Sequence, residues 1–249
     1  EYPPTDEELK KINEDKAKGD LLGRTLTEIV KAFKEMPFTM KQLIPVQFLT
    51  WFGMFCYWQY ITLGLSQSLY GTLDHTSDAF AKSQLLTGEI NGTYNIICFS
   101  IAFLLVPLAK KIGAKNVHFT CLVIGGVGLI AMQFLNDTDV LFQIWNPLGD
   151  KPIAITQIYL ISFGLGLTWA SAMAMPYKLL AGSIPPDKTG VYMGIFNMFI
   201  VIPMAIQIFM MQTFLYDLLG ANPVNVITLA GICLIGSGIF ALFIREKQL

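Results

Sequence analysis

Long apolar stretches separated by short polar segments dominate the pattern along this chain. They run over about residues 43–69, 89–108, 117–135, 153–180, 191–215 and 224–244. A helix that crosses a bilayer needs about 20 predominantly apolar residues, and these stretches have that length. The pattern therefore predicts an all-α membrane protein, with a six-helix transmembrane bundle over 43–246 and a short cytoplasmic tail at 247–249.

The segment before the first stretch, residues 1–42, has a different pattern and carries about half of the charged residues of the chain. Towards its end, apolar residues recur at helical spacing with lysines between them; these are Leu22, Leu26, Ile29, Val30, Phe33 and Met36. This spacing is typical of an amphipathic helix on a membrane surface or against a bundle, and we expect Pro37 to end it. A solvated linker is the alternative interpretation.

The composition agrees with a membrane protein. Apolar residues make up 53% of the chain and charged residues 14%, whereas soluble domains have about a quarter charged residues. A single soluble core is therefore excluded, and the net charge of −1 gives no indication of nucleic acid binding. All four cysteines, Cys56, Cys98, Cys121 and Cys233, fall inside apolar stretches, which is typical of small buried side chains.

The charges between the stretches predict the orientation in the membrane. One side carries the charged first segment and most of the remaining basic residues, namely Lys110, Lys111, Lys115, Lys188, Arg245 and Lys247. The other side carries two lysines against six aspartates, Asp74, Asp78, Asp137, Asp139, Asp150 and Asp217. Because cytoplasmic loops are enriched in Lys and Arg, the first side and both termini are expected to be cytoplasmic.

Motifs for catalysis do not occur in the sequence. It has no HExxH and no GxSxG, and His75 and His118 are expected in loops or at span edges, so an enzyme or a metal site has little support. No glycine-rich phosphate-binding loop is present either, which argues against a protein driven by ATP hydrolysis. Glu89 is the one carboxylate that reaches a predicted span, so this chain is not by itself an obvious proton-coupling unit.

Polar and aromatic residues inside the spans are the candidates for chemistry. The candidate ligand-binding residues are Trp58 and Gln59 in the first span, Tyr94 and Asn95 in the second, and Asn197 and Gln207 in the fifth. An unpaired amide in hydrocarbon costs on the order of several kcal/mol, so the amides are expected to face the bundle interior. Aromatic faces stack on the C–H side of a sugar and amides bond its hydroxyls. The alternative is that the amides pair across helices and the aromatics form interfacial belts.

Three segments resemble a known family. The stretch from Lys110 to Lys115, KKIGAK, resembles the short basic loop of the major facilitator superfamily, although that loop usually has an acidic residue where Lys110 stands. The stretches QFLTWFGMFCYWQY and MPYKLLAGSIPPDKTGVYMGIFNMFIVIP resemble the C-terminal half of sucrose- and maltose-type glycoside:cation symporters in that superfamily. Family members often have Gln directly after the span-eleven proline, where this chain has Met204; Gln207 lies one turn further on.

This resemblance implies a function. It implies a secondary transporter of a sugar, such as sucrose or maltose, that works by alternating access around a midplane site. The implied energy source is a proton or sodium gradient, with no cofactor, and an N-terminal six-helix half is the expected partner. The coupling residues are expected in that half, so the chain, which begins at Glu1 without an initiator Met, is expected to be a fragment. The expected location is a cell membrane, such as a bacterial inner membrane.

Other interpretations stay open on the sequence alone. One is a facilitator for another neutral solute, such as a nucleoside or a peptide. Another is a sugar sensor that does not transport. In each case the basic loop of Lys110, Lys111 and Lys115 is expected to act at the cytoplasmic face, on lipid phosphates or on the other half, and not on the substrate.

The topology can be tested by cysteine labelling. A cysteine introduced at position 78 should react with a membrane-impermeant reagent from outside the cell, and one at position 113 should react after the cytoplasmic face is opened. The physical reason is the asymmetry of Lys and Arg between the two sides. Labelling of position 113 in intact cells would contradict the orientation.

Overall fold

A computed structural model describes residues 31, 33–146, 149–185 and 188–246. Its long helices are α3 (Phe38–Tyr70), α4 (Asp78–Ile112), α5 (Ala114–Ala131), α6 (Leu160–Ala181), α7 (Thr189–Met210) and α9 (Pro223–Leu242). The shorter elements are η1 (Met132–Phe134), β1 (Val140–Ile144), β2 (Ile153–Thr156), η2 (Gln157–Tyr159), the π-helix η4 (Met211–Leu215) and α8 (Tyr216–Leu218). The described chain is therefore an all-α bundle with one small hairpin.

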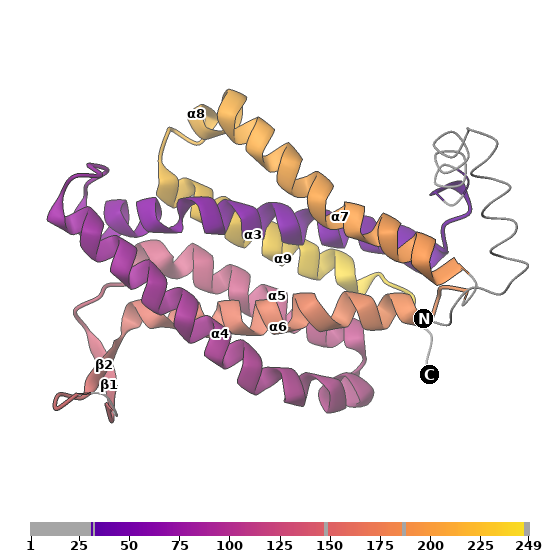
Figure 1. The fold of residues 1–249 in the computed structure, drawn as a ribbon, viewed down its shortest axis with the longest axis horizontal. Helices are drawn as coiled ribbons and strands as arrows, with labels where there is room; N and C mark the ends of the chain where they lie inside the picture. Colours follow the sequence, from indigo (N-terminus) through magenta and orange to yellow (C-terminus); the bar gives the residue numbers. More distant parts are fainter. Residues whose placement is uncertain (1–30, 32, 147–148, 186–187, 247–249) are drawn as a thin grey trace, which may run out of the picture.

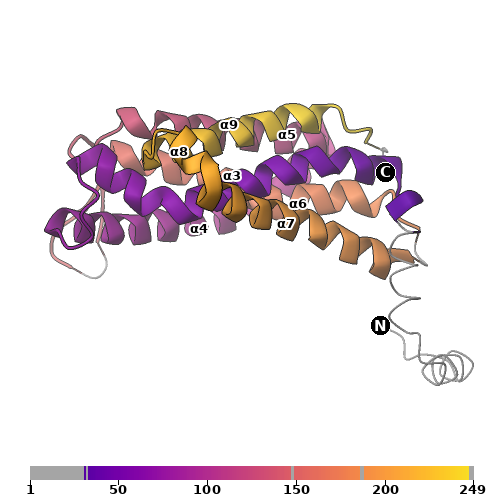
Figure 2. The same cartoon turned by 90° about the horizontal axis from the view of Figure 1, so that it is seen from above.

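The long helices lie side by side along the longest axis of the molecule (Figures 1 and 2). α3 packs along α9, α9 along α5, α5 along α6 and α6 along α4, while α7 packs on α3. The start of α3, the connection between α6 and α7 and the end of α9 lie at one end of the bundle (Figure 1). The β1–β2 hairpin and the connection between α3 and α4 lie at the opposite end, which agrees with the chain crossing back and forth.

Five of the described helical segments are long and apolar enough to cross a membrane. They are Asp78–Ile112, Ala114–Phe134, Gln157–Ala181, Thr189–Leu218 and Pro223–Leu242. α3 is the sixth long helix, with 33 residues. Polar residues such as Gln47, Thr50 and Gln59 lower its hydropathy. Its place inside the bundle, between α9 and α7, identifies the chain as a multi-pass helical membrane protein.

The helix boundaries differ most from the sequence prediction at α4 and at the start of the fourth span. α4 begins at Asp78, where the Ser77 Oγ accepts a hydrogen bond from the Phe80 backbone N–H at 3.1 Å. That polar cap lies outside the apolar stretch, so hydropathy alone places the start too late. The prediction that the fourth span begins near 153 is wrong for its first residues, because Ile153–Thr156 pair antiparallel with Val140–Ile144. A short apolar run does not distinguish a strand from a helix.

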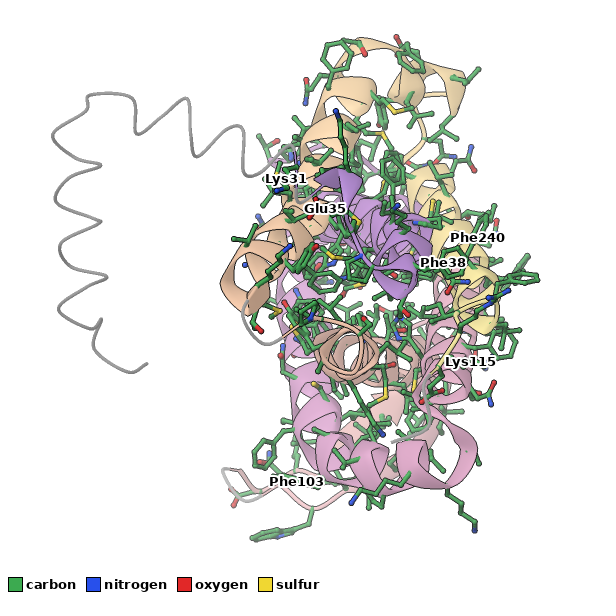
Figure 3. All side chains as sticks on the ribbon, turned by 90° about the vertical axis from the view of Figure 1, so that its right-hand side faces the viewer. Lys31, Glu35, Phe38, Phe103, Lys115 and Phe240 are labelled. Atoms are coloured by element: carbon green, nitrogen blue, oxygen red, sulfur yellow. The ribbon has the colours of Figure 1, made fainter. Side chains whose placement is uncertain are left out.

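The predicted amphipathic helix before Pro37 lies mostly outside the described residues. Within the described part, Phe33 is helical and its ring meets the edge of Phe199 on α7 at 6.4 Å between centroids. Glu35 forms an ion pair with Lys188 at 3.2 Å. Figure 3 shows Glu35 and Phe38 at the end of the bundle that faces the viewer. This short described piece is therefore attached to the start of α7.

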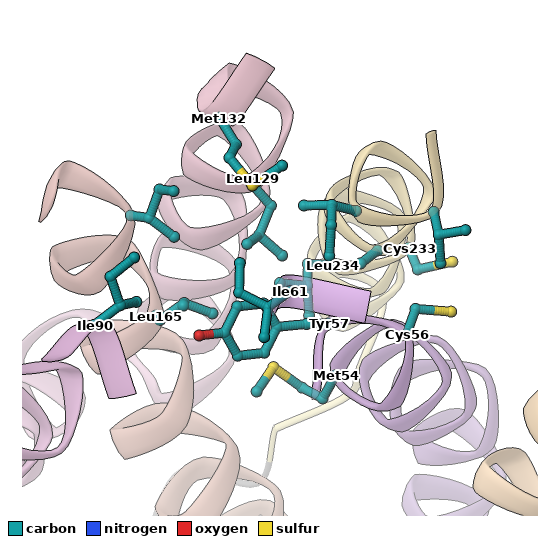
Figure 4. Packing of buried hydrophobic residues seen from close by; sticks show 14 of the residues in the cluster. Met54, Cys56, Tyr57, Ile61, Ile90, Leu129, Met132, Leu165, Cys233 and Leu234 are labelled. Carbon is teal, nitrogen blue, oxygen red and sulfur yellow. The ribbon is translucent and has the colours of Figure 1, made fainter. Parts of the chain in front are cut away.

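Glycines allow the closest helix contacts in the core. A Cβ atom built on Gly126 of α5 would lie 2.5 Å from the Gly231 carbonyl oxygen of α9, and the reverse distance is also 2.5 Å. The two backbones therefore touch directly, as small residues permit in membrane helices. Large side chains such as Tyr57, Leu129 and Leu234 fill the space between α3, α5 and α9 (Figure 4).

The glycine contact can be tested by adding one methyl group. Gly126→Ala should lower the unfolding free energy of the detergent-solubilised protein by about 2 kcal/mol, because overpacking against a backbone atom forces the helices apart. The matched control is Gly128→Ala on the same helix, where an added Cβ meets only the Ile161 Cα at 3.9 Å, an ordinary van der Waals distance. It should be neutral or stabilising by up to about 1 kcal/mol, since Ala favours helix more than Gly does. Equal melting temperatures for the two variants would contradict the α5–α9 packing.

Candidate functional site

Three tryptophans from two helices meet in one aromatic cluster. Trp58 of α3 and Trp169 of α6 have ring centroids 5.3 Å apart at an interplanar angle of 79°. Trp51, two turns before Trp58, lies 5.9 Å from Trp169 and 6.4 Å from Trp58. Phe55 meets the edge of Trp58 at 6.3 Å. Edge-to-face aromatic contacts of this kind are favourable, so the cluster joins α3 to α6.

The cluster lies near the middle of both helices. Trp58 is 20 residues after Phe38 and 12 before Tyr70, and Trp169 is 9 residues after Leu160 and 12 before Ala181. At a rise of about 1.5 Å per residue, both rings are well inside the membrane and not at its interfaces. Trp58 is half-buried, so part of its ring faces the side of the bundle that no described helix covers, called the open side below. This position near the middle of both helices differs from that of an interfacial belt, which lies near the ends of membrane-spanning helices.

Tyr94, a predicted site residue, lies in the seam between α3 and α4. It is 6% exposed, and its ring meets the edge of Tyr57 at 6.5 Å between centroids. The Tyr57 hydroxyl donates a hydrogen bond to Asn91 Oδ1 at 2.8 Å. Tyr94 therefore packs beside a buried polar pair, and the amide engaged there is Asn91 and not the predicted Asn95.

Three of the predicted amides are exposed on the described chain. Gln59, Asn95 and Asn197 are all solvent-accessible, and the Asn95 Nδ2 donates to the Asn91 carbonyl of its own helix at 2.8 Å. The expectation that the amides face the interior is therefore wrong for these three residues. The helix face that carries each of them is not covered by another described helix.

Gln207 is the predicted site residue that is fully buried. Its Nε2 donates to the Cys56 Sγ of α3 at 3.5 Å, while its Oε1 has no partner among the described residues. This contact joins α7 to α3 on the side of α3 that also faces α9. Gln207 is thus separated from the tryptophan cluster by the body of α3.

His118 lies one turn after the start of α5, close to the predicted span edge. It is fully buried, and its Nδ1 is 2.7 Å from the Ser171 Oγ of α6. His118 therefore contributes to the contact between α5 and α6. Among the described residues, no group of three His, Cys, Asp or Glu side chains is arranged to hold a metal ion.

A shallow pocket of about 340 Å³ opens at the end of the bundle near the hairpin. Two tyrosine–carboxylate pairs border it: the Tyr70 hydroxyl donates to Asp137 Oδ2 at 2.6 Å, and the Tyr159 hydroxyl donates to Glu89. Glu89 therefore ties α4 to the segment before α6. It lies in the fourth turn of the 35-residue α4 and not at mid-depth.

A larger pocket of about 830 Å³ lies at the opposite end and is bordered by the basic loop. Lys110 and Lys111 are exposed beside it, with Lys178 on α6. Lys115 instead contacts the end of α9. Its Nζ donates hydrogen bonds to the backbone carbonyls of Leu242 and Ile244 at 3.2 Å each. Figure 3 shows Lys115 near the end of α9.

A carboxylate from the end of the chain completes this basic region. Glu246 Oε1 accepts a hydrogen bond from the Ala114 backbone N–H at 2.8 Å. It thereby caps the N-terminus of α5, where backbone N–H groups favour a negative charge. Sequence reasoning missed this contact, because Glu246 and Ala114 are far apart along the chain.

The fold and these buried polar contacts define a multi-pass helical membrane protein, and comparison with known proteins narrows the class. No family model matches the sequence. The chain is similar to the sucrose transport protein SUC3 of Arabidopsis thaliana, with 22% identity over 198 residues, which are 74% of this chain and 32% of the relative. It is also similar to the sucrose transport protein SUT1 of Oryza sativa subsp. japonica, with 27% identity over 195 residues, 72% of this chain and 35% of the relative. The chain thus spans about a third of the length of these relatives.

Substitutions can distinguish the role of Lys115, which donates hydrogen bonds to the end of α9, from that of the exposed Lys111. Lys115→Met should lower the unfolding free energy by about 1–2 kcal/mol, because it leaves two carbonyls at the end of α9 without their charged donor. The matched control, Lys111→Met, removes the same group from an exposed position and should change stability by less than about 0.5 kcal/mol. Thermal melts of the purified variants give the comparison. An equal loss in both would show that the capping contact does not stabilise the bundle.

Proposed function

We propose that this chain is the C-terminal six-helix half of a secondary transporter for a sugar, and that it supplies one wall of a sugar-binding cavity. The sugar is a disaccharide of the sucrose type. Alternating access moves it across the membrane, and a proton gradient drives the step.

The observation that carries the proposal is the mid-depth cluster of Trp51, Trp58 and Trp169. Aromatic faces inside a membrane bundle are a suitable platform for the C–H face of a sugar ring, and Trp58 is accessible from the open side. Gln59 follows Trp58 directly and is exposed. An aromatic platform with a nearby amide suits a neutral, polyhydroxylated ligand, since it offers hydrogen bonds without a fixed charge.

The relatives support the same substrate class. Both are sucrose transport proteins, and the aligned region covers nearly three quarters of this chain. We therefore infer sucrose, or a sugar of similar size, as the first substrate to test.

The exposed surfaces of α4 and α7 support a second half. The same pattern, Gly-xxx-Gly-xx-Asn, occurs on both helices, as Gly88, Gly92 and Asn95 on α4 and as Gly190, Gly194 and Asn197 on α7. An added Cβ at any of these four glycines meets nothing within 4 Å. In α4 and α7, 17% and 28% of the most apolar window is buried, against 61% in the window that contains α6. Small residues beside an exposed amide favour close packing of another helix over contact with lipid.

The coupling group is expected in that second half. The carboxylates on the described long helices are Asp78 and Glu89, and both lie near the hairpin end of the bundle. Proton relays in membranes use ionisable groups inside the spans. A proton-coupled mechanism therefore requires a carboxylate from the other wall of the cavity.

The proposal can be tested by uptake of radiolabelled sucrose. Cells that express the complete protein containing this chain should accumulate sucrose, and a protonophore should abolish the accumulation. Cells that express 1–249 alone at the same membrane level should not, because half a cavity cannot alternate its access. Absence of uptake of sucrose, maltose and related disaccharides by a complete protein present in the membrane would overturn the proposal.

Asn197 provides a test of the cavity wall within the same assay. If Asn197 contacts the sugar, Asn197→Ala should raise the apparent KM by about 10-fold, which corresponds to about 1.4 kcal/mol of lost binding, with nearly unchanged stability. The matched control is Met198→Ala, one residue further along the exposed face of α7, where Met198 is 40% exposed; KM should not change there. A lower melting temperature with an unchanged KM would assign Asn197 to helix packing.

A further inference from the structure

Two neighbouring residues of α3 bury polar atoms that have no hydrogen-bond partner among the described residues. These atoms are Gln47 Nε2, Gln47 Oε1 and Trp51 Nε1. Gln47 is 1% exposed and Trp51 is 6% exposed. Three buried donor or acceptor atoms without a hydrogen-bond partner therefore lie within about one helical turn.

The buried hydroxyl groups near the middle of α3 are paired. Thr50 Oγ1 lies 2.7 Å from Ser237 Oγ of α9, and the Ser237 hydroxyl also donates to the Val46 carbonyl at 2.7 Å. The Tyr57 hydroxyl donates to Asn91. Burying an amide without a partner costs on the order of several kcal/mol in an apolar environment. The unpaired state of Gln47 and Trp51 is therefore specific to one face of the helix.

That face points at the aromatic cluster. Gln47 and Trp51 are four residues apart, so they lie on the same side of α3 in successive turns. The Trp51 ring contacts both Trp58 and Trp169. Gln47 lies one turn further towards the start of α3, so it is on the far side of Trp51 from Trp58. Gln47 thus lies beside the aromatic cluster, towards the start of α3, and Trp51 Nε1 belongs to a ring of the cluster itself.

The set of atoms selects a ligand chemistry. The Gln47 Oε1 accepts a hydrogen bond, while the Gln47 Nε2 and the Trp51 Nε1 donate. A hydroxyl group gives one hydrogen and accepts others, so it satisfies both kinds of atom at once. A carboxylate leaves the Gln47 acceptor unpaired, and an ammonium leaves both donors unpaired. A neutral hydroxylated ligand is therefore the best match.

We propose that Gln47 and the indole N–H of Trp51 form an inner subsite that binds a hydroxyl of the transported sugar. The subsite is closed in this structure, because Gln47 and Trp51 are 1% and 6% exposed. This inference rests on the proposed function, because it adds hydrogen-bonding groups at the edge of the aromatic platform. It assigns sugar recognition to two residues that the exposed surface does not reveal.

The test uses the complete protein and measures two quantities, the Kd for sucrose and the melting temperature without sugar. Gln47→Met keeps the length of the side chain and removes its polar atoms. We expect it to weaken sucrose binding by at least 10-fold and to leave the melting temperature unchanged or raised, because an unpaired buried amide is replaced by an apolar group. Trp51→Phe, which keeps an aromatic ring without the N–H, should also weaken binding.

The matched control is Thr50→Val, which removes a paired hydroxyl three residues from Gln47. It should lower the melting temperature and change the Kd by less than 2-fold. Thr50→Val should thus lower the melting temperature without weakening binding, and Gln47→Met should weaken binding without lowering the melting temperature. This difference distinguishes a sugar-binding side chain from one that only stabilises the bundle.

Deoxy analogues of sucrose identify the hydroxyl. An analogue that lacks the hydroxyl bound by Gln47 should bind the natural protein at least 10-fold more weakly than sucrose does. With Gln47→Met, sucrose and that analogue should bind equally, because the partner is already missing. The other analogues should show the same relative loss in both proteins.

The failures are distinguishable. If the natural protein binds sucrose and Gln47→Met binds it equally well, the inner subsite is wrong while the proposed function stands. If Gln47→Met lowers the melting temperature without a change in Kd, Gln47 pairs with another part of the protein and the subsite is also wrong. If the natural protein binds no sugar, the proposed function fails and the subsite fails with it.

Discussion

A polar group inside a membrane must find a hydrogen-bond partner, and the arrangement of this bundle depends on that constraint. Water is absent from the hydrocarbon core, so backbone groups are paired within helices and polar side chains pair between them. Thr50 with Ser237 holds α3 to α9, Tyr57 with Asn91 holds α3 to α4, and His118 with Ser171 holds α5 to α6. Gln47 and Trp51, on the aromatic side of α3, together have three buried polar atoms without a partner among the described residues, and this side of α3 is the candidate binding face.

α3 makes different kinds of contact on its different sides. One side of it packs on the backbone of α9, where a Cβ on Gly53 would lie 2.9 Å from the Ala230 carbonyl oxygen. Another side carries Trp51 and Trp58 towards α6. A helix with such varied sides has lower hydropathy than its neighbours, which is why composition alone ranks it below the other spans. The same variety is what a binding wall requires, because a purely apolar helix has no groups with which to recognise a sugar.

Much of this arrangement follows from the sequence, and the parts that do not have physical reasons. Apolar length alone places the long helices, but the hairpin of Ile153–Thr156 depends on pairing with Val140–Ile144, which no local pattern encodes. The spacing of Trp51 and Trp58 places both on one helix face, yet Trp169 joins them through the packing of α3 on α6. Whether an amide is buried depends on its neighbours, so Gln207 and Asn197, on the same helix, have opposite environments. The Glu246 cap on α5 is a long-range contact and was missed for the same reason.

The central claim is that a sugar binds at mid-depth against α3 and α6, and photolabelling tests it most directly. A sucrose derivative with a small photoreactive group would be cross-linked to the complete protein in membranes, with and without excess unmodified sucrose, and the labelled peptides would be mapped by mass spectrometry. The account predicts sucrose-protected adducts on the peptides that contain Trp58 and Trp169. Protected adducts confined to other parts of the protein, with none on α3 or α6, would contradict it.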